Sequence, residues 1–107
     1  MPVIEVGNGV VTHINVFTVA PERQDELVQS LRETVEAASR MTGWISASIH
    51  RSSDGRHVAN YVQFESAEAG QTVTRQLLAM GLIQRNLEIA TVNPGQYEVV
   101  FTLDKVS

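Results

Sequence analysis

The residues best placed to do chemistry in this chain of 107 residues are asparagines set among apolar neighbours. Asn60 lies in HVANYVQF, residues 57–64, which reads as a strand. Alternate strand residues share a face, so Asn60 falls in one row with Val58, Val62 and Phe64. A buried amide without a partner costs about 1–3 kcal/mol. An amide in an apolar row could instead hold a small molecule, because ligand pockets are mostly apolar with a few polar groups.

Asn15 is the second candidate, in VVTHINVFTV over residues 10–19, also a predicted strand. If the strands containing Asn15 and Asn60 are neighbours in one sheet, the two amides can lie close together. His13 shares strand parity with Asn15 and Phe17, so it is the histidine that could reach the same face. The amides could also simply satisfy each other or a helix end, and the residues leave both interpretations open.

Other chemistries find little support in the composition. The chain has no cysteine, and its three histidines show no metal-ligand spacing such as HxxxH, so we expect no metal. The glycines of GNG at 7–9 precede the first strand and form no phosphate loop. A net charge of −4, with one lysine and scattered arginines, provides no basic stripe for nucleic acid. No signal peptide or membrane segment is apparent, so we expect a cytoplasmic protein and no membrane partner.

The helices and strands that must position these residues have clear boundary signals in the sequence. Residues 20–40 predict a helix, with Pro21 at its start and Leu27 and Leu31 on one face. Residues 44–51 and 57–64 flank the turn SSDG and predict a hairpin. Its register is expected to pair these residues: Ile49 with Asn60, Ala47 with Val62, and Ile45 with Phe64.

The second half repeats the order strand, helix, strand. Ser66 is a predicted helix cap, and we expect a break near Gly81 followed by a second short helical piece. Asn93-Pro94-Gly95 predicts a turn before a final strand over 96–104. The order favours an α+β, ferredoxin-like split βαβ fold with a four-stranded antiparallel sheet and helices on one face. We expect residues 1–107 to form one domain.

That fold leaves one face of the sheet bare. By strand parity the bare face carries Trp44, His50 and Tyr61, a mixture of aromatic and polar groups. Such a surface predicts contact with another subunit, so we expect a homodimer through this face.

The run from Asn15 to Ser66, with NVFTVAP, GWISASIHRSSDG and VANYVQFES, resembles the antibiotic biosynthesis monooxygenase family. These proteins are dimeric α/β barrels and include small anthrone oxygenases that use no cofactor. In those oxygenases an Asn-Tyr pair is followed by a tryptophan, and the asparagine and the tryptophan face the substrate pocket. Asn60 and Tyr61 match the pair, whereas Phe64 stands in place of the tryptophan and Gly70 in place of a pocket tyrosine.

The resemblance implies a cofactor-independent monooxygenase that oxidises a planar phenolic or anthrone-type polyketide intermediate to a quinone with O2. Asn60 and Asn15 would donate to a substrate oxygen, and His13 would be a candidate general base. The walls would be formed by four apolar residues: Phe17, Ile49, Val62 and Phe64. Two alternatives stay open, namely a cyclase-like tailoring enzyme and a dimeric small-molecule-binding protein without turnover.

Overall fold

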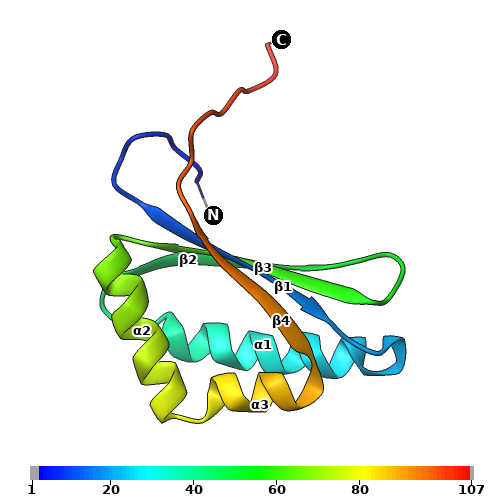
Figure 1. Ribbon diagram of the computed structural model, residues 1–107. Helices are drawn as coiled ribbons and strands as arrows, with labels where there is room; N and C mark the ends of the chain where they lie inside the picture. Colours follow the sequence, from blue (N-terminus) through cyan, green and yellow to red (C-terminus); the bar gives the residue numbers. More distant parts are fainter. Residues whose placement is uncertain (1–2, 107) are drawn as a thin grey trace.

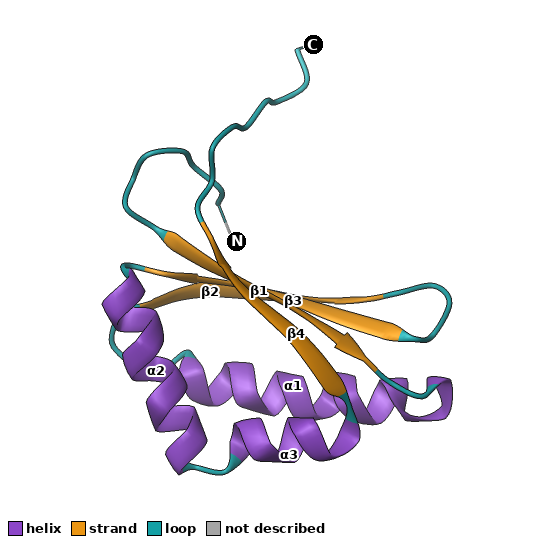
Figure 2. Cartoon of the chain, in the orientation of Figure 1, coloured by secondary structure: helices purple, strands orange, loops and turns teal. Residues whose placement is uncertain are grey.

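The computed structural model describes residues 3–106 and consists of one antiparallel sheet with its helices on one face (Figures 1 and 2). The strands are β1 (Val11–Thr18), β2 (Trp44–Arg51), β3 (His57–Phe64) and β4 (Thr91–Tyr97), in the order β2-β3-β1-β4. The helices are η1 (Pro21–Arg23), α1 (Gln24–Ala38), α2 (Ala67–Ala79) and α3 (Leu82–Ile89). The expected α+β, ferredoxin-like architecture is therefore confirmed. Within the described residues no helix is both long and apolar enough to cross a membrane.

The helix boundaries follow their local signals. Pro21 opens the 3-10 turn before α1, and the α1 side chains Leu27 and Leu31 are fully buried. The Ser66 hydroxyl accepts a hydrogen bond from the Ala69 N–H at 3.1 Å and caps α2. Gly81 has a φ of +78°, a conformation that glycine adopts without strain, and it separates α2 from α3 as predicted.

The β2–β3 hairpin keeps the predicted register over most of its length. Ile49 pairs with Asn60 and Ala47 with Val62, but the register shifts between Trp44 and Ser46. Trp44, not Ile45, lies opposite Phe64. The prediction for Ile45 is therefore wrong, because a β-bulge inserts one residue and reverses the faces before it.

The last strand begins five residues earlier than predicted. β4 contains Asn93, Pro94 and Gly95, with Pro94 opposite Asn15 of β1. β4 is an edge strand, so no strand among the described residues pairs with its outer side. Pro94, which has no N–H, therefore removes no hydrogen bond between strands on that side. Residues 98–106 form no regular secondary structure and leave the sheet on the side away from the helices (Figure 1).

The core between the sheet and the helices has two buried clusters. One gathers around Phe17, Leu27 and Val58, and the other around Phe64 and Val73. Both clusters contribute side chains to the pocket described below.

Candidate active site

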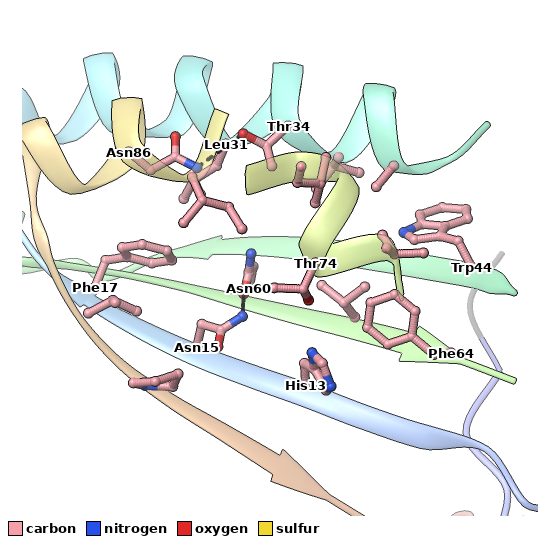
Figure 3. Close-up of a pocket in the computed structure, with 18 of the residues that line it drawn as sticks. His13, Asn15, Phe17, Leu31, Thr34, Trp44, Asn60, Phe64, Thr74 and Asn86 are labelled. Atoms are coloured by element: carbon pink, nitrogen blue, oxygen red, sulfur yellow. Dashed lines mark hydrogen bonds between the residues drawn. The ribbon is translucent and has the colours of Figure 1, made fainter. Parts of the chain in front are cut away.

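A pocket of about 550 Å³ lies between the sheet and the helices. Its floor comes from β1, β3 and β4, and its roof and sides come from the three α-helices (Figure 3). Most of its lining is apolar, including Phe17, Leu31, Val62, Phe64 and Leu77. The few polar groups in the lining are His13, Asn15, Thr34, Asn60, Thr74, Asn86 and Gln96.

The amides of Asn15 and Asn60 meet on the floor of this pocket. The two residues are direct partners in the β1–β3 ladder, and Asn15 Nδ2 donates to Asn60 Oδ1 at 2.8 Å. This bond engages the Asn60 oxygen but leaves the Asn60 amide nitrogen free to donate. Figure 3 shows that nitrogen directed away from the sheet toward the roof. Among the described residues, no acceptor receives a hydrogen bond from it.

His13 lies beside the amides, and its ring contacts Phe64 with centroids 4.7 Å apart. Burial lowers the pKa of His13 below 6.5, and the Gln96 side chain opposes this effect more weakly. The ring is therefore neutral at pH 7 and able to accept a proton.

Gly70 of α2 packs directly over His13 and Phe64. A Cβ at Gly70 would lie 3.0 Å from His13 Nε2 and 3.2 Å from Phe64 Cδ2. The two rings thus occupy the space next to the helix, and a larger side chain at Gly70 would displace them.

Trp44 lines the pocket, contrary to its predicted place on the bare face of the sheet. The bulge after Trp44 turns its side chain to the helix side, where it packs against the second core cluster. Its indole nitrogen is buried and has no hydrogen-bond partner among residues 3–106. His50 and Tyr61 keep the predicted parity of the open face, because each pairs in the regular part of the ladder.

The structure brings six of the seven predicted site residues into the pocket lining: His13, Asn15, Phe17, Asn60, Val62 and Phe64. Ile49 is the exception, because it packs against the first core cluster and does not line the pocket. Sequence reasoning missed the polar roof residues Thr34, Thr74 and Asn86. No motif marks them, since they are isolated polar positions on amphipathic helices.

Three comparisons relate the chain to known proteins: one with a curated relative, one with solved structures and one with a family model. It is 48% identical over 56 residues to tetracenomycin-F1 monooxygenase of Streptomyces glaucescens, a match that covers 51% of this chain and 50% of that protein. The chain thus aligns with about half the length of this relative.

Solved structures share the whole fold at lower identity. SnoaB, a cofactor-independent oxygenase from Streptomyces nogalater, superposes with a TM-score of 0.78 at 20% identity, covering 91% of this chain and 99% of that chain. A conserved protein from Methanosarcina mazei gives a TM-score of 0.76 at 11% identity, covering 85% and 93%. At these identities the likeness shows a common fold. A family model for antibiotic biosynthesis monooxygenases matches residues 10–75, more than half of the chain, which therefore belongs to the antibiotic biosynthesis monooxygenase family.

Proposed function

We propose that this protein is a cofactor-independent monooxygenase that oxidises a planar phenolic or anthrone-type polyketide intermediate to a quinone with O2. The observation that carries the proposal is the free Asn60 Nδ2 group on the floor of an apolar pocket. The similarity to tetracenomycin-F1 monooxygenase and to SnoaB, a cofactor-independent oxygenase, supports the reaction class.

The size and lining of the pocket suit a flat aromatic ligand. Its volume of about 550 Å³ falls within the range of roughly 300–1,000 Å³ common for small-molecule sites. Phe17, Val62 and Phe64 offer apolar surfaces to the ligand, and the amides offer donors at one place. Such a pocket orients a polycyclic molecule by its oxygens while keeping its rings out of water.

The reaction asks the protein to stabilise negative charge. Removing a proton from the CH2 group of an anthrone produces an electron-rich anion. Its negative charge rests largely on the oxygen of the former carbonyl group. Asn60 Nδ2 would donate to that oxygen, and Asn15 would hold the Asn60 amide in place through its 2.8 Å hydrogen bond. His13, neutral at pH 7, is the candidate acceptor of the proton.

The substrate anion itself then reduces O2. One oxygen atom bonds to the former CH2 carbon, and the resulting hydroperoxide loses water to form the second carbonyl. The carbon gives up two hydrogens, which leave with the other oxygen atom as water. The reaction balances with O2 as the oxidant, so it needs no external reductant.

The test is aerobic incubation of metal-stripped protein with anthrone, without added flavin, nicotinamide or metal. Quinone absorbance and oxygen uptake are followed together, with one O2 expected per quinone. Asn60→Ala should slow the reaction at least tenfold because one donor to the developing charge is lost. Asn93→Ala is the matched control, since Asn93 lies in β4 outside the pocket lining.

Two results would count against the proposal. A wild-type rate no faster than spontaneous oxidation would favour a cyclase-like or purely binding role on the same fold. Equal rates in wild type and Asn60→Ala would remove Asn60 from the chemistry.

We also propose that the protein acts as a homodimer through the sheet face opposite the helices. His50 and Tyr61 belong to this face, and Val16 of β1 is 38% exposed there. Part of the face is already covered, because Gln63 Nε2 donates to the Val3 carbonyl oxygen at 3.0 Å. The exposed apolar side chains that remain are the kind of surface that a second copy would bury.

A further inference from the structure

A second polar cluster lies in the roof of the pocket, between α1 and α3. Asn86 of α3 is only 4% exposed, and it lines the pocket together with Thr34 of α1. Ser30 contacts Asn86 and Arg85 contacts Ser30, but neither of them lines the pocket. Ser30 Oγ donates to Asn86 Oδ1 at 2.6 Å, and Asn86 Nδ2 donates to Thr34 Oγ1 at 3.0 Å.

The hydrogen atoms of this cluster fix the orientation of the Asn86 amide. Arg85 can only donate, and its Nε donates to Ser30 Oγ at 3.0 Å, so the Ser30 hydrogen is directed to Asn86 Oδ1. The Thr34 hydroxyl donates its hydrogen to the Ser30 carbonyl oxygen at 3.0 Å, so Thr34 Oγ1 acts as the acceptor toward Asn86 Nδ2. The Asn86 oxygen is thereby the acceptor and its nitrogen the donor. Nδ2 carries two hydrogens, and the described residues engage one of them.

The roof amide of Asn86 and the floor amide of Asn60 lie on opposite sides of the pocket. Figure 3 shows Asn86 in the helix layer and the Asn60 nitrogen pointing up from the sheet, with Leu31 and Phe17 in the space between the layers. Two amide nitrogens with uncommitted hydrogens thus border one apolar pocket from opposite sides. Each nitrogen keeps a hydrogen that it can donate, so each favours a ligand that brings an acceptor into the pocket.

We propose that Asn86 is a second ligand-binding residue and that the pocket selects planar polycyclic molecules with acceptor oxygens on two opposite edges. One oxygen is bound by Asn60 and the other by Asn86. Ser30 and Arg85 are positioning residues that keep the Asn86 donor directed into the pocket. The aromatic class of the ligand rests on the proposed function, whereas the role of Asn86 rests on the hydrogen bonds in the roof.

The test compares two probes that differ by one oxygen. Anthrone has a carbonyl on one edge, and 9,10-anthraquinone has carbonyls on opposite edges. Binding is measured without O2, so anthrone is not consumed, by quenching of Trp44, the one tryptophan of the chain, which lines the pocket. Wild type should bind anthraquinone about five- to tenfold more tightly than anthrone, as one additional hydrogen bond allows.

Asn86→Asp keeps the shape of the side chain but replaces the free donor with an acceptor. The ratio of the two affinities should fall to about one or below. Gln24→Glu is the matched control because it makes the same chemical change in another buried amide. Gln24 Nε2 donates to the carbonyls of Ser52 and His57, away from the pocket, so this variant should lose stability and keep the wild-type ratio.

Ser30→Ala is the second variant, in case Asn86→Asp does not fold. It leaves the amide in place and removes the group that orients it, so the ratio should fall partway. An unchanged ratio in a folded Asn86→Asp or Ser30→Ala protein would show that Asn86 only ties α3 to α1. Failure of either probe to quench Trp44 would also overturn the inference. A changed ratio in a protein that forms no quinone would uphold Asn86 and reject the proposed reaction.

Discussion

At the scale of single residues, the pair of Asn15 and Asn60 satisfies only part of its own hydrogen-bonding capacity. The sequence left two interpretations open, mutual satisfaction and a ligand site. The observed bond at 2.8 Å supports the first for the Asn60 oxygen and leaves the Asn60 nitrogen available for the second. Both interpretations therefore describe the same two side chains, and mutation can separate their contributions.

The single variant Asn60→Leu should lower the free energy of unfolding by about 1–3 kcal/mol, because the Asn15 amide loses its acceptor. The double variant Asn15→Leu, Asn60→Leu should regain most of this loss, since both partners become apolar. Both proteins should oxidise anthrone at least tenfold more slowly than wild type. Urea unfolding and oxygen uptake check the two effects. Full activity of the double variant would contradict a role for either amide in the reaction.

His13 predicts a dependence of stability on pH. Its pKa is lowered in the folded protein, chiefly by burial, from the usual value of 6.5. As the pH falls through 6.5, the unfolded chain takes up a proton that the folded chain does not, so stability decreases. The decrease ends once the pH falls below the folded pKa. Urea unfolding at pH 7.5 and at lower pH should show a smaller decrease in His13→Gln than in wild type.

The rate of anthrone oxidation should also depend on the protonation state of His13. If His13 is the proton acceptor, the rate stays constant above its lowered pKa and falls below it. A His13→Gln protein that retains the wild-type rate at pH 7 would exclude this role. The proton would then be accepted by another group of the substrate or by water.

At the scale of elements, the bulge at the start of β2 decides which side chain enters the pocket. Simple alternation would bury Ile45, whereas the structure leaves Ile45 40% exposed and turns Trp44 inward. Ile45→Thr should therefore change the free energy of unfolding by less than about 0.5 kcal/mol, as surface substitutions do. Leu27→Ala, at a fully buried position, should cost about 2–5 kcal/mol in the same urea experiment. A loss near 2 kcal/mol for Ile45→Thr would argue for an unbulged strand.

The elements also show what the sequence could and could not predict. Local chemistry was sufficient for the helix starting at Pro21, the cap at Ser66 and the break at Gly81. It failed for β4, because Asn93-Pro94-Gly95 reads as a turn unless the strand is known to be at an edge. Asn15, Asn60 and His13 could be found from strand parity. Asn86 could not, since its importance depends on how α3 packs against α1.

At the scale of the whole molecule, the sheet separates two different surfaces. Its helix side encloses the pocket, and its other side is where the chain after β4 departs (Figures 1 and 2). That departing segment carries exposed apolar side chains, with Phe101 74% and Leu103 80% exposed. Exposed apolar side chains gathered on one side of a protein favour an interaction surface, so the segment and the open sheet face together favour association of two copies.

Sedimentation at micromolar concentration should therefore show a dimer of the wild-type chain. The variant Phe101→Glu, Leu103→Glu places two carboxylates where apolar contact is expected, and it should shift the protein toward the monomer. The variant Thr102→Glu, Lys105→Gln is the matched control, because it makes the same segment more negative by the same two charges at polar positions. A dimer that survives the first variant unchanged would place the interface on the sheet alone. A wild-type monomer would reject the dimer and require the exposed apolar groups to meet some other partner.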